Sequence, residues 1–151
     1  MRAPFDLLYL VATGVWAGAL AYLTIAVPIL GKRLGRRPAW QATRALLALS
    51  DLFGTWAGTI AVGCLWLGRQ HGFRAPWAVC LGTLALMITL ALYHRAVLIP
   101  SLDAAFKRLG AGDEDPKWGR DWRFLWRMSQ GLRYSILLGS ILCFVLGVED
   151  L

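Results

Sequence analysis

Four long apolar stretches divide the sequence and restrict its fold more than any other feature. They cover about residues 7–30, 45–68, 76–98 and 130–148. A helix that rises about 1.5 Å per residue needs about 20 apolar residues to cross about 30 Å of hydrocarbon, and most of these stretches are near that length. Inside a bilayer the backbone must satisfy its own hydrogen bonds, and the stretches lack the alternation of strands. We therefore predict an all-α fold, a four-transmembrane-helix bundle that forms one domain over residues 1–151.

The composition agrees with a membrane protein. Hydrophobic residues make up 58% of the chain and charged residues only 17%, and the mean hydropathy is +0.54. These values are unusual for a water-soluble domain of this size. The basic residues Lys32 and Arg33 follow the first apolar stretch rather than precede it, so we interpret this stretch as a permanent span and not as a secretory signal.

The basic residues are distributed unevenly between the connections. Thirteen of the sixteen lysines and arginines lie in or beside the connections that follow the first and third stretches. The positive-inside rule places these two connections in the cytoplasm and both termini in the periplasm of a bacterial inner membrane. The net charge of +7 is then explained by topology and by attraction to anionic lipid headgroups. It requires no nucleic-acid partner.

A tryptophan- and arginine-rich segment, KWGRDWRFLWRMSQ (117–130), precedes the fourth stretch. Trp118, Trp122, Leu125 and Trp126 recur at helical spacing, and arginines occupy other positions around the helix. This pattern is typical of an amphipathic helix at the membrane interface. We expect an interfacial helix along the inner surface before the fourth span, and a helix that docks a partner protein is the alternative.

Two similar pentapeptides, GVWAG (14–18) and GTWAG (54–58), lie inside the first and second stretches. Membrane helices associate where small residues let the backbones approach closely, and GxxxG is such a pattern. We predict that the two glycine faces meet, with Trp16 and Trp56 around the contact. A ligand cleft beside this contact is the alternative interpretation.

Ionisable residues inside the spans are few, and they are candidate functional residues because burying them in lipid is costly. They are Asp51, His94, Arg95 and Arg133, all expected in the cytoplasmic half of the membrane. In one interpretation Asp51 pairs with Arg133 or Arg95, while His94 faces water or a carbonyl group. In the other, His94 is a metal or tetrapyrrole ligand, and Asp51 and the arginines handle propionates or protons.

Two segments resemble a known family. The sequences WAGALAY (16–22) and LALYH (90–94) resemble the first and third spans of HemJ-type protoporphyrinogen oxidases and, more loosely, of copper-resistance CopD-like domains. The resemblance implies a four-helix membrane fold, haem b or another tetrapyrrole as cofactor, and a redox or tetrapyrrole-related role. Tyr9 stands where the family has its first-span histidine, and Thr83 where it has a lysine, so only His94 carries over as a ligand.

The remaining patterns leave the chemistry open. The cysteines Cys64, Cys80 and Cys143 show no CxxC spacing, so we interpret them as small buried hydrophobic residues, with a Cu(I) site as the alternative. Hydrolase, metalloprotease and phosphate-loop motifs are absent, so no catalytic residue is assigned and enzymatic activity stays open.

Two functions therefore compete. The chain either binds a tetrapyrrole through His94, or it is a non-enzymatic accessory or structural subunit. In the second case it docks onto a larger membrane complex or forms a homo-oligomer. In both cases its first partner is the lipid bilayer.

Overall fold

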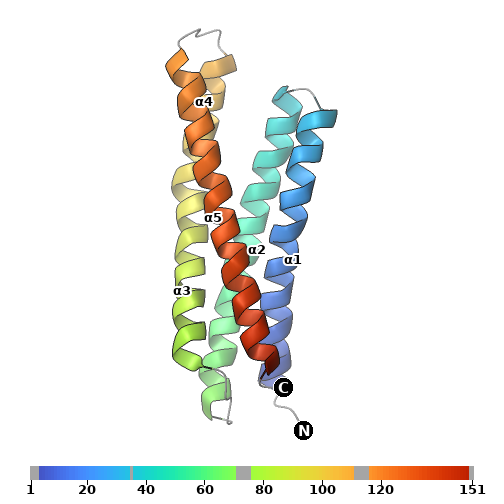
Figure 1. The fold of residues 1–151 in the computed structure, drawn as a ribbon, viewed down its shortest axis with the longest axis vertical. Coiled ribbons are helices and arrows are strands. Elements are labelled where there is room, and N and C mark those ends of the chain that lie inside the picture. Colours follow the sequence, from blue (N-terminus) through green and yellow to red (C-terminus); the bar gives the residue numbers. More distant parts are fainter. Residues whose placement is uncertain (1–3, 35, 71–75, 111–115, 150–151) are drawn as a thin grey trace.

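The computed structural model describes residues 4–34, 36–70, 76–110 and 116–149, and the regular elements in these ranges are all helices. In chain order they are α1 (Pro4–Arg33), α2 (Arg36–Gln70), α3 (Trp77–Tyr93), the π-helical turn η1 (His94–Leu98), α4 (Ile99–Gly110) and α5 (Pro116–Glu149). Figure 1 shows that α3, η1 and α4 follow one another as a single rod, which gives a bundle of four long helices. The predicted all-α four-helix fold is confirmed.

All four rods are long and apolar enough to cross a membrane, as expected of a multi-pass membrane protein. The candidate spans are Pro4–Arg33, Arg37–Gly68, Trp77–Leu109 and Gly119–Val148. Helix α1 begins and α5 ends at the same end of the bundle (Figure 1). The opposite end carries the basic residues that close α1 and α4. We call this opposite end the basic end.

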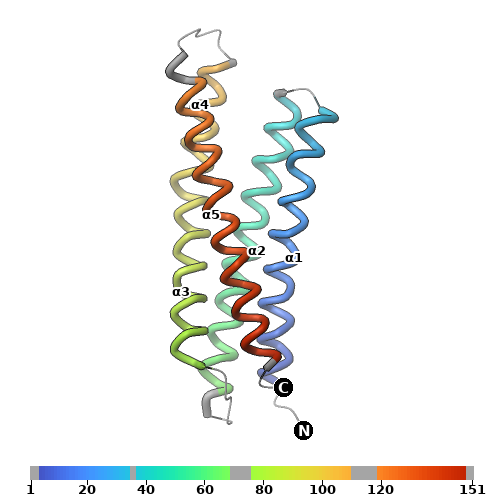
Figure 2. Tube along the Cα trace, viewed as in Figure 1, coloured from blue at the N-terminus to red at the C-terminus, as the bar shows by residue number. Residues whose placement is uncertain are grey.

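The tryptophan-rich segment before the fourth span is helical, but it does not turn into that span from the membrane surface. It forms the first turns of α5, which runs from Pro116 to Glu149 as one helix (Figure 2). The Trp122 ring lies 4.9 Å from Trp40 of α2 and 5.5 Å from Phe106 of α4, between ring centroids. The aromatic face therefore packs inside the bundle, because α2 and α4 offer it aromatic partners there.

The glycines of α2 make room for the side chain of Trp16. They do not pack against the glycines of α1. A Cβ atom at Gly58 would lie 2.6 Å from Cζ3 of Trp16 and 2.8 Å from Cγ1 of Ile88, and one at Gly54 would overlap the indole nitrogen of Trp16. Trp16 is 2% exposed, whereas Trp56 is 64% exposed. The glycine pair thus forms a notch in α2 that receives the Trp16 ring.

The glycines of α1 have other surroundings. A Cβ atom at Gly14 would lie 3.3 Å from the Phe144 ring of α5, and one at Gly18 would meet nothing within 4 Å. The prediction that the two glycine faces meet is therefore wrong. The physical reason is that the indole of Trp16 occupies the space that α2 leaves free.

The core has two apolar layers. The larger layer lies toward the end where α1 begins and includes Trp16, Leu65 and Leu84. The smaller layer lies toward the basic end and consists of Leu23, Val27, Leu47 and Ile99, with Trp126 packed against it. Polar side chains of α2, η1 and α5 lie between these two layers along their helices.

Candidate functional site

A fully buried histidine lies at the centre of this polar level. His94 is 0% exposed, and both of its ring nitrogens have partners on other helices. Nδ1 is 2.6 Å from Oδ2 of Asp51 on α2, and Nε2 is 2.7 Å from Oγ of Ser129 on α5. The result is a carboxylate–imidazole–hydroxyl chain that connects three rods of the bundle. We call Asp51, His94, Ser129 and the neighbouring Arg133 the polar cluster.

The backbone that carries His94 is a π-helical turn, and the sequence gives a reason for it. Pro100 has no N–H group, and its ring would clash with the carbonyl four residues earlier in a regular helix. Just before it, the N–H of Ile99 donates to the carbonyl of His94, five residues back. The widened turn lets the rod continue past Pro100. Single π turns of this kind occur often at functional sites.

Arg133 brings a positive charge to the cluster. It lies on α5 one turn after Ser129, is 7% exposed and interacts electrostatically with Asp51. Its guanidinium carbon is 5.6 Å from the centroid of the Trp126 ring, which is a cation–π distance. The Nε atom of Arg133 is buried without a hydrogen-bond partner. The cluster therefore holds one buried guanidinium and one buried carboxylate at the same level of the bundle.

One arrangement of protons leaves the cluster electrically neutral. With Asp51 as a carboxylate and Arg133 as a cation, a neutral His94 leaves the cluster without net charge. A carboxylate only accepts hydrogen bonds, so in this state the Nδ1–H group of His94 donates a hydrogen bond to Asp51. Nε2 then accepts a hydrogen bond from the hydroxyl of Ser129. Each of the four side chains has an electrostatic or hydrogen-bond role in this arrangement.

The same order of groups activates serine nucleophiles in hydrolases, where a carboxylate orients a histidine that accepts the hydroxyl proton. Here Ser129 is fully buried, so a substrate cannot reach its oxygen in this arrangement. What the structure shows here is a buried hydrogen-bonded chain that connects three helices.

The structure brings together three of the four residues predicted for the site. Asp51, His94 and Arg133 belong to the polar cluster, whereas Arg95 is exposed on η1 and lies outside it. The hydrogen-bonded partner of Asp51 is His94 rather than an arginine. Ser129 was missed because only ionisable groups were considered. Its position four residues before Arg133, on the same face of α5, is the signal that would have found it.

Both ring nitrogens of His94 are in hydrogen bonds, so neither lone pair is available to a haem iron without a rearrangement. Such a ligand must direct the lone pair of one ring nitrogen at the iron. In this structure Nδ1 and Nε2 of His94 are both in hydrogen bonds, and the ring is completely buried. The contact of Nδ1 with Asp51 resembles the support that ligating histidines usually have. Ser129, however, lies within hydrogen-bond distance of Nε2, so it would have to move before a metal could bind there.

The three cysteines are buried, and none of them is in a disulfide. The Cys143 thiol lies 4.0 Å from the carbonyl oxygen of Cys80. Among the described residues, no group of three or more His, Cys, Asp or Glu side chains is placed to hold a metal ion. The burial of the three cysteines agrees with their interpretation as small hydrophobic residues.

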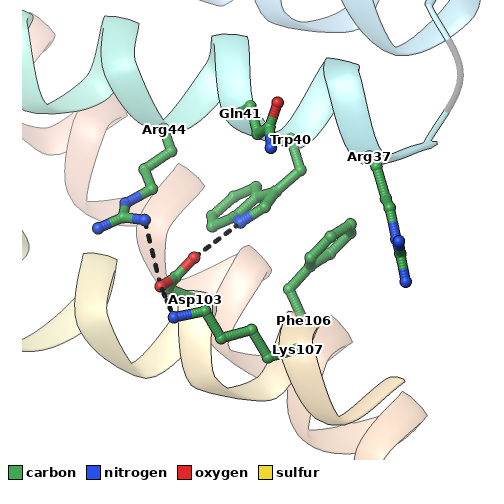
Figure 3. A pocket seen from close by; sticks show the side chains of 7 residues that line it. All are labelled: Arg37, Trp40, Gln41, Arg44, Asp103, Phe106 and Lys107. Carbon is green, nitrogen blue, oxygen red and sulfur yellow. Dashed lines mark hydrogen bonds and ion pairs between the residues drawn. The ribbon is translucent and has the colours of Figure 1, made fainter. Parts of the chain in front are cut away.

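A second polar network lies near the basic end and was not predicted from the sequence. Asp103 of α4 forms ion pairs with Arg44 at 3.2 Å and Lys107 at 3.0 Å, and it accepts a hydrogen bond from the Trp40 indole at 3.3 Å (Figure 3). Asp103 is 14% exposed, while its cationic partners are at least half exposed. The network connects α2 with α4.

We expect Asp103→Asn to lower the free energy of unfolding by about 1 kcal/mol, because partly exposed ion pairs contribute little each. Denaturant unfolding in detergent measures the change. Asp121→Asn on α5 is the control and should have a smaller effect. The difference between the variants should shrink in about 1 M salt, which screens exposed charges. Equal effects of both substitutions at low salt would contradict the role given to Asp103.

In comparisons with known proteins, no protein family, no curated protein and no solved structure matches this chain.

Proposed function

We propose that this chain is an integral membrane protein whose functional centre is the polar cluster, and that the cluster binds and releases a proton inside the bilayer. The observation that carries the proposal is the buried chain from Asp51 through His94 to Ser129, with contacts of 2.6 and 2.7 Å. Histidine is the side chain whose charge changes most readily near neutral pH.

The free-energy cost of burying ionisable groups in the polar cluster supports a functional role. Membrane helices associate through small residues and close packing, as α1 and α2 do where Trp16 enters the notch at Gly54 and Gly58. Packing alone needs no ionisable groups, and such groups are costly in lipid. A buried carboxylate, imidazole and guanidinium at one level therefore favour a role in addition to packing.

Protonation would change how α5 is held. A protonated His94 has no lone pair on Nε2, so its Nε2–H would donate to the hydroxyl oxygen of Ser129, and the direction of this hydrogen bond would reverse. It would also place a second positive charge in the buried cluster with Arg133, where Asp51 is the only carboxylate described. Helix α1 adds no compensating charge, because residues 7–31 contain no Asp, Glu, Lys, Arg or His. Proton uptake thus adds a cation to the level of Arg133 and reverses the hydrogen bond between η1 and α5.

Infrared difference spectroscopy between about pH 5 and pH 8 tests the proposal. With ¹⁵N-labelled histidine, we expect shifted imidazole bands together with a carboxyl band. His94→Gln should remove the imidazole bands of the cluster, and Asp51→Asn should remove the carboxyl band. His71, the other histidine of the chain, lies outside the described residues. The variant His71→Gln identifies the bands of His71, which serve as the reference. Imidazole bands that belong to His71 alone would overturn the proposal.

Haem or another tetrapyrrole bound through His94 is the second candidate. The contact between Asp51 and Nδ1 favours it, because a carboxylate in this position orients a ligating imidazole. Binding would require Ser129 to leave Nε2. A Soret band in protein purified from cells, lost in His94→Ala and kept in Ser129→Ala, would favour this candidate over the proton-binding site.

A role as an accessory or structural subunit is the remaining alternative. In that case the polar cluster fixes the register of α2, η1 and α5, which is the best-attested use of buried polar groups. A larger complex that co-purifies unchanged with both the wild type and His94→Gln would favour it.

The location that we propose is a bacterial inner membrane, with the basic end in the cytoplasm among anionic headgroups and both termini in the periplasm. Lys32 and Lys107 are exposed near the basic end. A membrane-impermeant amine reagent should label them only after the cells are opened. Labelling of either lysine in intact cells would reverse the orientation.

A further inference from the structure

A cavity of about 440 Å³ opens between α2 and α4 near the basic end. Figure 3 shows that its side chains come from the first turns of α2 and from α4. They are Arg37, Trp40, Gln41, Arg44, Asp103, Phe106 and Lys107. The cavity is separate from the polar cluster, because none of the cluster residues lines it.

The lining has a surplus of positive charge. Three of the side chains are cations, and Asp103 is the one carboxylate among them. Asp103 lies within 3.2 Å of Arg44 and 3.0 Å of Lys107, so it holds two of the cations in place without neutralising the cavity. Arg37 on the first turn of α2 adds the third. Because Arg44 and Lys107 share one carboxylate, an anionic ligand would balance the lining.

The other part of the lining is aromatic. Trp40 is 6% exposed, and its ring stacks on Phe106 with 5.5 Å between centroids. The Trp40 indole N–H donates a hydrogen bond to Asp103. This bond fixes the ring between the charged side chains and the apolar wall of the cavity. An arrangement of cations beside an aromatic wall suits a molecule that has an anionic group next to an apolar part.

The depth of the cavity matches such a molecule. Its lining residues on α2 precede residue 45, where the second apolar stretch begins, and those on α4 follow residue 98, where the third ends. The cavity therefore lies at headgroup level if the rods cross a bilayer. Basic pockets between membrane helices at this level bind the headgroups of anionic lipids.

From charge, aromatic lining and depth together, we infer that this cavity is a binding site for the phosphate of an anionic phospholipid. Arg37, Arg44 and Lys107 contact the phosphate, and Trp40 with Phe106 contacts the glycerol and the upper part of an acyl chain. The inference uses the proposed membrane placement and is independent of proton binding by His94.

Native mass spectrometry of the detergent-solubilised protein with phosphatidylglycerol or phosphatidylcholine tests the inference. We expect tighter binding of phosphatidylglycerol, and about fivefold weaker binding of it in Lys107→Gln, since one basic residue near a charged headgroup contributes about 1 kcal/mol. Arg33→Gln is the matched control, because Arg33 is exposed at the same end but does not line the cavity. His94→Gln should bind the lipid like the wild type, even where the proton-binding proposal fails.

Three outcomes would overturn the inference. Equal binding of the two lipids would show that the cavity does not select an anionic lipid. Equal weakening of binding by Lys107→Gln and Arg33→Gln would show that the effect comes from the general positive charge of the surface. If inorganic phosphate displaces the lipid at millimolar concentration and binds equally well when no lipid is present, the cavity is a site for a soluble phosphate compound. Loss of lipid binding in Arg37→Gln with an unchanged melting temperature would support the assignment through a second lining residue.

Discussion

Replacing Gly54 by leucine should lower the free energy of unfolding by about 3 kcal/mol or more, the upper range for overpacking a tight contact. A Cβ atom at this position already overlaps the indole nitrogen of Trp16, and Trp16 is almost completely buried. The ring cannot move aside easily, because Gly58 bounds it one turn further along α2. Leucine would therefore force α1 away from α2. Thermal unfolding and gel filtration in detergent measure the loss.

The matched control is Gly63→Leu on the same helix. Gly63 is exposed, and a Cβ atom there would meet nothing within 4 Å. Leucine at this position should leave stability unchanged or raise it slightly, because glycine is the poorer helix former. A double-mutant cycle with Trp16→Ala should show that the two substitutions are not additive, since both disturb the same contact. Equal melting temperatures for Gly54→Leu and Gly63→Leu would disprove the notch.

The notch illustrates what a sequence pattern can and cannot predict about packing. The four apolar stretches predict four helices, because hydrocarbon leaves the backbone few alternatives. The GxxxG spacing also predicts that α2 is closely approached at Gly54 and Gly58. It does not predict which atoms approach. Trp16 and Trp56 stand in nearly identical pentapeptides, yet the first is buried and the second is exposed. Their difference depends on the rotation of each helix against its neighbours.

The amphipathic segment of α5 shows a similar limit. The spacing of Trp122 and Trp126 predicts one apolar helical face, and the structure has it. The same face would suit a membrane surface or the interior of a bundle. Trp40 and Phe106 decide between the two, and they lie on helices distant in sequence. Local periodicity contains no information about such partners.

The polar cluster was partly predictable because charge in a membrane helix is rare. Counting ionisable groups finds Asp51, His94 and Arg133, and the topology places them at one depth. It also selects Arg95, which the rotation of η1 leaves exposed. Ser129 could not be separated from other hydroxyl residues of the spans by type alone. Its role follows from its 2.7 Å contact with His94, which only the packing of α5 creates.

Asp51→Asn is expected to be the most damaging change in the polar cluster, with a loss of about 3–5 kcal/mol in the free energy of unfolding. The substitution keeps the size of the side chain but removes the charge that balances Arg133, and an uncompensated buried cation has a cost of this size. Ser129→Ala removes only one hydrogen bond between membrane helices, for which about 0.6 kcal/mol is the average. Unfolding in mixed detergent–SDS micelles measures both variants.

Asp113→Asn is the control for the removal of a carboxylate. Asp113 lies outside the described residues, in the acidic stretch GAGDEDP (110–116), and we expect little effect there. The double variant Asp51→Asn/Arg133→Met separates charge from hydrogen bonding. If the unpaired guanidinium causes the loss, removing it should restore most of the stability, although the contact between position 51 and His94 stays altered. If the double variant is as unstable as Asp51→Asn, the hydrogen bond to His94 dominates. A stability of Asp51→Asn equal to that of Asp113→Asn would mean that the carboxylate of Asp51 is not buried beside Arg133.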